Sequence, residues 1–337
     1  MSTNPPVVLY HYEASPFAKK VQSLLALKGV PYTRVLVLNI PPRPALSTLL
    51  GITYRRVPVL AIGSDIYCDS AAIASALERR FPAAPTLYPF RVGVGKTAPI
   101  AEEVVKTDTA VVRALAFWAE GQVFPTVQDH MPYESLPAEW IHDRSGHRGA
   151  PIDIPTIVAR RDDSKSTVAS HLALLEAQLA DGREWLLDTT APGLADIIVH
   201  TPFAWARTLS SLADLFDPTV VPRTIAWLDR TSTYLDARRV SAPVISPEDA
   251  AHVITSAQAE DIDYTVGFNA TDARRLGTER GDAVTVTPRD VGKVPTVGTL
   301  VALSSEEIVL ETRGEVGVVR CHFPRLGFQI KKAEAKL

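Results

Sequence analysis

Residues 7–81 constrain the fold more than any other part of the chain. They begin with a short apolar run, residues 7–10, which predicts a buried strand. Ser15 and Pro16 then open a helix, because Pro at the first helical position lacks only an N–H that would have no partner there. A second apolar run at 35–38 follows the helix. The order strand, helix, strand favours parallel strands joined by a right-handed crossover.

The same segment continues with a strand and a second helix. The strand at 57–62 has Pro58 near its start, which suits a residue that cannot donate to a sheet ladder. Asp69 and Ser70 then cap a helix predicted for residues 71–80. The sequence alone does not decide whether the Val57–Pro58 bond is cis.

Ser15 is the first candidate for chemistry. It stands at a helix N-terminus beside the carboxyl end of a strand, where backbone N–H groups and the helix dipole favour an anion such as a thiolate. A Ser hydroxyl can donate a hydrogen bond to that thiolate. The alternative is that Ser15 only caps the helix.

Four short motifs over about 75 residues carry a resemblance to a known family. The segment resembles the thioredoxin-like N-terminal domain of the glutathione S-transferase superfamily. It is most similar to the tau-like and omega-like classes, whose active site reads Ser-Pro-Phe or Cys-Pro-Phe after the first strand. The matching motifs are Ser15-Pro16-Phe17-Ala18, Lys28-Gly29-Val30-Pro31-Tyr32, Arg56-Val57-Pro58-Val59-Leu60 and Asp69-Ser70.

The resemblance implies a role for each matching residue. Ser15 would stabilise the glutathione thiolate. Val57 would pair its backbone with the cysteinyl part of glutathione, with Pro58 as the cis-proline. Asp69 and Ser70 would hold the γ-glutamyl end, whose amino group wants a carboxylate and whose carboxylate wants donors at a helix start.

Further cofactor contacts are expected nearby. Phe17 and Arg56 are counted with the glutathione-binding residues, and Arg43, Arg55 or Arg56 could meet the glycyl carboxylate. The chain departs from many relatives in having Asp69 where they carry Glu or Gln. Because the catalytic position is Ser15 and not Cys, conjugation or isomerisation is expected in preference to thiol-disulfide reduction.

Composition limits the class of protein. A length of 337 residues predicts two or three domains, and a net charge of −3 argues against a general nucleic-acid binder. Cys68 and Cys321 are too few for a disulfide framework and fit a reducing compartment. The short polar start and the absence of a run of roughly 20 apolar residues predict a cytoplasmic protein without a membrane span.

The middle of the chain is expected to be helical. A Pro-rich linker at 81–90 leaves a first domain of residues 1–82, and residues 97–128 have the spacing of one or two long amphipathic helices. In the resembling family this region faces the electrophile pocket, so Phe117, Trp118 and Phe124 are candidate pocket residues. The alternative for each aromatic residue is a place in the core of the helical bundle.

Residues 129–156 interrupt the helical pattern with a polar stretch that predicts a loop insertion over the pocket. His142 and His147 lie there, but no Cys or carboxylate set completes a metal site, so no metal is assigned. The insertion is a candidate lid that could set substrate choice.

Helical patterns return at 156–187 and 225–234, which completes an all-helical domain of residues 91–240. Asp196 resembles the family's capping-box residue, although Gly193 replaces the usual Ser or Thr three positions earlier. Asp196 is therefore expected to be structural.

Residues 245–337 extend beyond what the resembling family needs. A helix start at Ser246 and Pro247 is followed by short strands separated by turn signals, which suggests a small β-barrel-like or half-barrel module with no catalytic set. The strands are expected at residues 283–287, 297–301, 308–312, 316–323 and 328–331.

The resemblance implies an enzyme that uses glutathione as cofactor and acts as a homodimer. Ser15 would activate the thiol for conjugation to a small electrophile, or for isomerisation or elimination on a pathway intermediate. One alternative is a binding or regulatory protein that keeps the fold without turnover. Another is an enzyme of the same fold with a different ligand.

Overall fold

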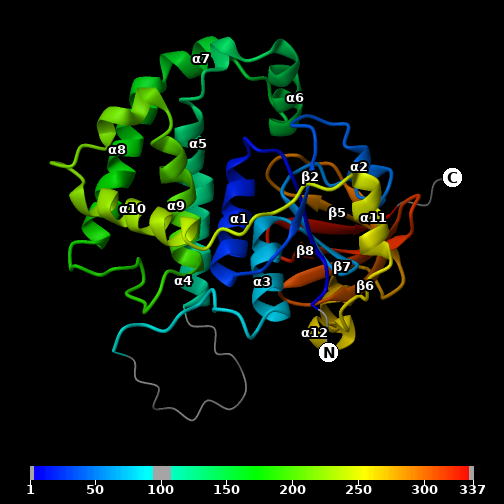
Figure 1. Ribbon diagram of the computed structural model, residues 1–337. Helices are drawn as coiled ribbons and strands as arrows, with labels where there is room; N and C mark the ends of the chain where they lie inside the picture. Colours follow the sequence, from blue (N-terminus) through cyan, green and yellow to red (C-terminus); the bar gives the residue numbers. More distant parts are fainter. Residues whose placement is uncertain (1–3, 94–107, 334–337) are drawn as a thin grey trace.

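The computed structural model of the chain describes residues 4–93 and 108–333. Its first part is a thioredoxin-like α/β unit (Figure 1). Strand β1 lies parallel to β2 and antiparallel to β3, which in turn pairs antiparallel with β4. The elements are β1 (Val7–His11), α1 (Pro16–Lys28), β2 (Thr33–Leu36), α2 (Pro44–Ser47), β3 (Val59–Ile62), β4 (Asp65–Cys68) and α3 (Ser70–Arg80).

The expected order of strand, helix and strand is present, and two elements were not expected. Helix α1 begins at Pro16 after the Ser15 cap and ends before Gly29, whose φ of 62° is left-handed. Strand β4 was missed because its four residues are all buried and show no alternation, and because the turn before it is short. The short helix α2 was also missed.

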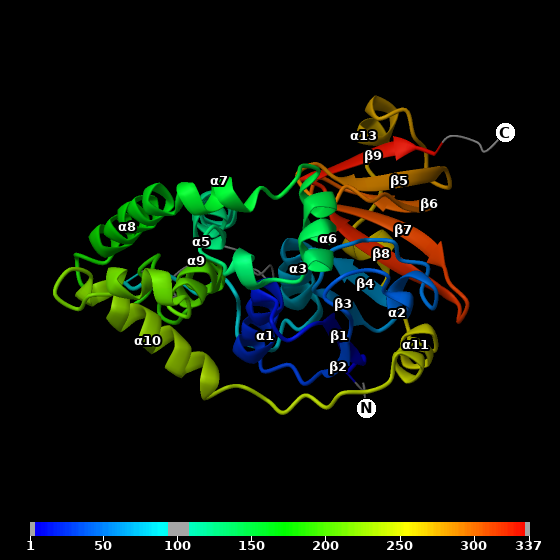
Figure 2. The ribbon, with the colours of Figure 1, turned by 90° about the horizontal axis from the view of Figure 1, so that it is seen from above.

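The middle of the chain forms the helical part seen on one side of the sheet in Figures 1 and 2. The expected helices at 97–128 appear as α4 and α5 joined by a π-helical segment at Ala119–Val123; their start at 97–107 lies outside the described residues. The helices of this part are α4 (Thr109–Trp118), α5 (Phe124–Gln128), α6 (Ala138–Arg148), α7 (Ile154–Ala159), α8 (Arg161–Gln178), α9 (Leu194–Ala206) and α10 (Pro222–Asp236).

The insertion at 129–156 is not the loop that the sequence predicts. It contains α6, which begins after Pro137 and ends at Gly149, whose φ is 73°. None of the α6 residues is fully buried, so the helix has no strong apolar stripe of its own. Contacts with other parts of the chain hold it, and sequence periodicity does not report such contacts.

The last part of the chain has the expected helix start and short strands. Ser246 caps α11, where its Oγ accepts a hydrogen bond from the Asp249 N–H at 3.0 Å. The elements are α11 (Pro247–Thr255), α12 (Ile262–Thr265), α13 (Ala270–Arg275), β5 (Ala283–Pro288), β6 (Thr296–Leu303), β7 (Glu307–Arg313), β8 (Val318–Pro324) and β9 (Phe328–Lys332).

These strands form the expected β-rich region, but in the described residues they do not close into a barrel. They continue the thioredoxin-like sheet, and in the described residues one nine-stranded sheet has the order β2-β1-β3-β4-β8-β7-β6-β5-β9 (Figure 2). The join is a parallel pairing of β4 with β8, in which Ile66 lies opposite Cys321. The physical reason is that β4 would otherwise present an unpaired sheet edge.

The sheet separates two buried cores. Alternate β1 residues face opposite sides: Val7 and Leu9 belong to the core shared with α1, α3 and the helical part, whereas Val8 and Tyr10 belong to the second. The second core also contains side chains from β5 to β9 and from α11. The C-terminal strands therefore complete the hydrophobic core of the first part of the chain.

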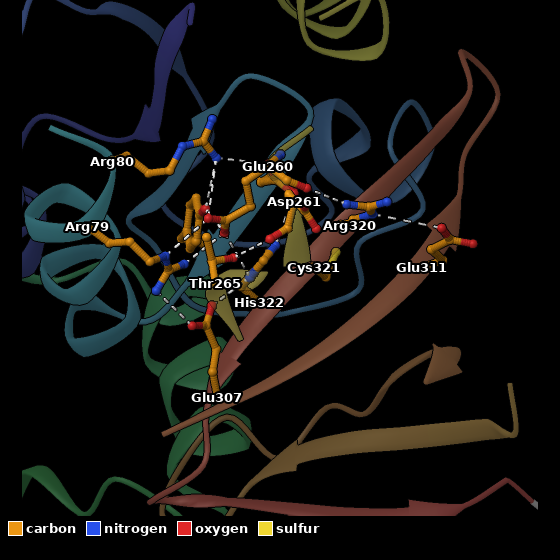
Figure 3. A network of polar contacts seen from close by, with 12 residues as sticks. Arg79, Arg80, Glu260, Asp261, Thr265, Glu307, Glu311, Arg320, Cys321 and His322 are labelled. Atoms are coloured by element: carbon orange, nitrogen blue, oxygen red, sulfur yellow. Dashed lines mark hydrogen bonds and ion pairs between the residues drawn. The ribbon is translucent and has the colours of Figure 1, made fainter. Parts of the chain in front are cut away.

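A buried ionic cluster lies across the join (Figure 3). His322 of β8 is fully buried between two carboxylates, with Nε2 3.2 Å from Asp65 Oδ1 and Nδ1 2.6 Å from Glu307 Oε1. Burial alone would lower the pKa of His322, but these two hydrogen bonds raise it to about 9. His322 is therefore cationic at neutral pH.

Two arginines of α3 complete the cluster. Arg79 donates to both oxygens of Glu260 at 2.8 and 3.1 Å and to Glu307 at 3.1 Å. Arg80 donates to Asp65 at 3.0 Å, and the Glu260 N–H donates to the same carboxylate at 2.7 Å. The three carboxylates are thus balanced by two guanidinium groups and one imidazolium, as a buried charge cluster requires.

Candidate functional site

Ser15 lies where β1 leads into α1. It is only 2% exposed, and its Oγ accepts a hydrogen bond from the Ala18 N–H at 3.2 Å. Its own backbone N–H donates to the Tyr12 carbonyl at 3.1 Å, which fixes the turn before the helix. A hydroxyl that accepts one bond can still donate its O–H. Capping the helix therefore does not exclude a hydrogen bond to a thiolate.

The Val57–Pro58 peptide bond is cis. The ladders that β3 makes with β1 and β4 begin at Val59, so Val57 lies just beyond the paired part of the strand. Its backbone is at the same end of the sheet as the start of α1, because β3 runs antiparallel to β1.

Asp69 and Ser70 lie at the start of α3. Asp69 has φ 85° and ψ 141°, a region that residues with a side chain rarely adopt, and its carboxylate accepts a hydrogen bond from the Ala71 N–H at 2.9 Å. Burial raises the pKa of Asp69, while the Ala71 hydrogen bond opposes the rise. The conformation holds the carboxylate over the helix N-terminus.

Lys20 lies beside the candidate site, and the sequence did not predict it there. Its ammonium group is buried, donates to Ser70 Oγ at 2.9 Å and pairs with Glu120 of the π-helical segment. A signal was present: Lys20 stands four residues before Leu24, on the buried face of α1. It brings a positive charge to the place expected for the γ-glutamyl carboxylate.

Arg56 lies beside Asp69, with a distance of 3.9 Å between guanidinium and carboxylate. Its other partners come from the C-terminal part of the chain: Nε donates to the Val291 carbonyl at 3.1 Å, and the guanidinium pairs with Asp290. The loop between β5 and β6 thus reaches the candidate site.

The sequence makes Arg43 a candidate for binding the glycyl carboxylate. In the structure, however, Arg43 is not available to a ligand. Its guanidinium is buried and donates to three backbone carbonyls, those of Leu38 at 2.8 Å, Asn39 at 3.1 Å and Arg55. Burial lowers the pKa of Arg43 to about 10. Arg43 holds the loop after β2 in shape.

The three aromatic candidates for the electrophile pocket have different surroundings in the structure. The ring centroid of Phe124 in α5 lies 4.9 Å from that of Phe17. The same ring stacks on Trp205 of α9, with 4.9 Å between the ring centroids. Trp118 instead packs within the helical part, where its Nε1 donates to His171 Nδ1 at 3.1 Å. Phe117 is 67% exposed. Only Phe124 is brought next to a residue of the Ser15 motif.

Two family models match parts of the chain. Residues 9–85 match the glutathione S-transferase, N-terminal domain, and residues 124–239 match a domain of unknown function (DUF7962). The crystal structure of a GST-like protein from Pseudomonas syringae is similar over 98% of this chain and 100% of that chain, with 27% sequence identity and a TM-score of 0.73. The chain has the glutathione S-transferase fold.

Two further similarities are weaker. Glutathione S-transferase U1 of Arabidopsis thaliana is 33% identical over 81 residues, which is 24% of this chain and 36% of that protein. The chain thus matches about a third of the length of that relative. Rice GST1 in complex with glutathione is 22% identical, with 75% of this chain and 96% of that chain covered and a TM-score of 0.47.

The additional strands belong to a shared architecture, because the Pseudomonas syringae protein matches almost the whole chain. Within this glutathione S-transferase fold, Asp196 is structural as expected. It accepts hydrogen bonds from the N–H groups of Leu186 and Gly193 and from Trp227 Nε1, each at 3.0 Å. A Cβ on Gly193 would lie 2.8 Å from Pro89, which explains why no Ser or Thr stands there.

One group of side chains has the composition of a metal site. Ligand atoms of Asp65, Glu260 and His322 all lie within 4.8 Å of one another. Each of them already hydrogen bonds to protein groups of the ionic cluster, including Arg79 and Arg80. We assign no metal to this group. Over residues 4–93 and 108–333, no helix is long and apolar enough to span a membrane.

Proposed function

We propose that the chain is a glutathione-dependent transferase in which Ser15 activates the thiol. The observation that carries the proposal is the convergence of three features at one end of a single α/β unit. Ser15 starts α1, Val57 precedes cis-Pro58 at the start of β3, and Asp69 starts α3 in a strained backbone conformation. Strain held at a candidate site is typical of functional residues.

In the proposed complex the γ-glutamyl end of glutathione lies at the start of α3. Asp69 binds its amino group, and Ser70, together with the buried ammonium of Lys20, binds its carboxylate. Val57 pairs with the cysteinyl backbone. This places the thiol near Ser15, at the positive end of the α1 dipole.

The proposed chemistry is nucleophile activation. The Ser15 O–H donates to the thiolate, which lowers the pKa of the bound thiol, and the helix N-terminus adds to the same effect. The thiolate then attacks an electrophilic carbon and forms a C–S bond. In a substitution the leaving group departs with its bonding electron pair, and in an addition the resulting carbanion takes up a proton from solvent. For isomerisation or elimination, the same bond breaks again after rearrangement.

The electrophile side is proposed to lie where α5 and α9 meet the start of α1. The contacts among Phe17, Phe124 and Trp205 support Phe124 as a pocket residue. Trp118 and Phe117 are also candidates for this pocket, but their surroundings support a place in it less well.

A tau-like class, a cytoplasmic location and a homodimer remain parts of this proposal, as do the domain boundaries 1–82, 91–240 and 245–337.

Calorimetric titration of the wild-type chain with glutathione tests the proposal, together with Asp69→Asn. This variant keeps the shape of the side chain and removes the charge, so we expect affinity to fall on the order of tenfold to a hundredfold. Asp261→Asn is the matched control, since Asp261 also caps a helix through its carboxylate but lies at α12. No heat of binding with the wild-type chain would refute the proposal.

A further inference from the structure

A groove lies between the β2 edge of the sheet and the segment that follows α10. That segment runs past α1 and along β2 on its way to α11 (Figures 1 and 2). The groove has a volume of about 330 Å³, at the lower end of the range that is typical of small-molecule sites. Its lining consists of Glu13, Gln22, Ala26, Tyr32, Arg34 and residues 239–242, and it includes neither Ser15 nor Asp69. It is therefore a second place for a ligand, apart from the candidate thiol site.

Arg34 of β2 is held in a fixed position in this groove. Its backbone N–H donates to the Pro243 carbonyl, and its carbonyl accepts from the Ile245 N–H, each at 2.9 Å. In its side chain, Nε donates to the Ala242 carbonyl at 2.9 Å, and Nη1 donates to Glu13 at 2.7 Å. The guanidinium group is thus oriented before a ligand arrives, which lowers the entropy lost on binding. None of the described residues accepts a hydrogen bond from its Nη2.

A second guanidinium group comes from Arg239, just after α10. It pairs with Asp236 at 2.8 Å, and both side chains are 62% exposed. Glu13, the carboxylate partner of Arg34, is 63% exposed. Ion pairs as exposed as these are weak, so an anion in the groove can compete for both guanidinium groups.

The groove also offers neutral hydrogen-bonding groups. The Tyr32 hydroxyl and the Gln22 amide make no hydrogen bond to any other described residue. Burial raises the pKa of Tyr32, the charges of Arg34 and Arg239 oppose the rise, and Glu13 adds to it. Both guanidinium groups therefore lie within electrostatic reach of one hydroxyl, which stays protonated and can donate to a ligand.

We propose that this groove binds a small polyanion, a molecule with at least two carboxylate or phosphate groups, between Arg34 and Arg239. Guanidinium groups suit both kinds of acid, because their N–H groups bind paired oxygens. Since the two arginines come from different segments, a ligand with two acid groups can contact both. Tyr32 and Gln22 then donate to its remaining oxygens. This proposal does not depend on glutathione.

Calorimetric titrations with citrate and with pyrophosphate, at one fixed ionic strength, test the proposal. We expect a dissociation constant on the order of 1 mM or lower for at least one of them, and the tighter probe identifies the carboxylate or the phosphate class. Arg239→Gln should weaken that binding on the order of tenfold. Arg238→Gln is the matched control and should bind as the wild-type chain does. Arg238 is the adjacent exposed arginine, but its guanidinium lies over the Tyr234 ring and does not line the groove.

Glu13→Gln gives a prediction in the opposite direction. The carboxylate of Glu13 competes with an anion for Arg34, so its removal should strengthen binding by about threefold to tenfold. An affinity no higher than that of the wild-type chain would place the anion elsewhere and overturn the proposal.

Three other results would also overturn it. These are no heat of binding with either probe, unchanged binding in Arg239→Gln, and equal weakening in Arg239→Gln and Arg238→Gln, which indicates non-specific attraction to surface charge. Asp69→Asn should leave the binding of the probe unchanged whatever the glutathione titration shows, so this inference and the proposed function fail separately. Circular dichroism and thermal unfolding of each variant establish that it is folded.

Discussion

At the residue scale, the position of Ser15 combines two roles that are usually argued as alternatives. Its oxygen accepts a hydrogen bond from the Ala18 N–H, and its hydrogen is left for a second partner. The chain offers an internal comparison, because the Oγ of Ser246 also caps a helix, α11, and is followed by Pro, although its hydroxyl donates to the Asp249 carboxylate at 2.7 Å. Only Ser15 lies near cis-Pro58 and Asp69.

Comparison of the variants Ser15→Ala and Ser246→Ala separates the loss of a helix cap from the loss of thiol activation. Ser15→Ala and Ser246→Ala should each lower the free energy of unfolding by about 1 kcal/mol through loss of the cap. In addition, Ser15→Ala should raise the pKa of the thiol of bound glutathione by about 1–2 units, because a hydrogen bond to the thiolate is lost. Thiolate absorbance against pH measures this shift. Binding with an unchanged thiol pKa in Ser15→Ala would favour the non-catalytic alternative.

The sequence predicted most of the residues that the structure brings to one end of the α/β unit. Ser15, Val57, Pro58, Asp69 and Ser70 are marked by helix caps and a strand-start Pro, which are local signals. The partners of these residues were less predictable. A buried Lys looks like a solvated one until its partner is known, and Glu120 lies one hundred residues from Lys20.

At the element scale, we expect protonated His322 to stabilise the join between β4 and β8. The folded chain holds the pKa of His322 at about 9, above the ordinary 6.5, so the bonds to Asp65 and Glu307 stabilise the fold fully below pH 6.5. This contribution is lost as pH rises through 9. A shift of this size corresponds to roughly 3 kcal/mol.

His322→Gln tests the role of this imidazolium. The variant should be less stable at pH 6 by about 3–5 kcal/mol, because Asp65 and Glu307 lose a buried cationic partner. The difference from the wild-type chain should shrink between pH 6.5 and 9, as measured by chemical denaturation across that range. His252→Gln, on the exposed side of α11, is the control and should follow the wild-type chain at every pH. A difference that stays constant with pH would mean that His322 is neutral in the fold.

Elements held by distant contacts were the hardest to predict. Alternation and turn residues predict the five C-terminal strands. They do not predict the pairing of these strands with β4, because a strand's own sequence does not determine which strand lies beside it. The sequence predicts a loop where α6 lies, for a related reason. Its stability comes from Arg55 and from Gly292, which lie in other parts of the chain.

At the scale of the whole molecule, the C-terminal strands and the thioredoxin-like unit share one sheet and one core. We therefore expect a chain ending at residue 244 to be insoluble or strongly destabilised, because the β4 edge and the apolar side chains behind it would face water. Soluble yield and thermal unfolding measure this. Supplying residues 245–337 as a separate polypeptide should restore some soluble protein. A truncated chain that unfolds at the wild-type temperature would show that the first two parts are independent.

The parallel pairing of β4 with β8 also has a consequence for synthesis. Asp65 and His322 are separated by 257 positions, so β4 leaves the ribosome long before its partner strand exists. At about 5–20 residues per second, the delay is on the order of 10 to 50 s. During that time the nascent chain carries an open strand and a half-covered apolar face. Each newly made molecule thus passes through an interval in which chaperones, or a neighbouring nascent chain on the same message, can reach that strand first.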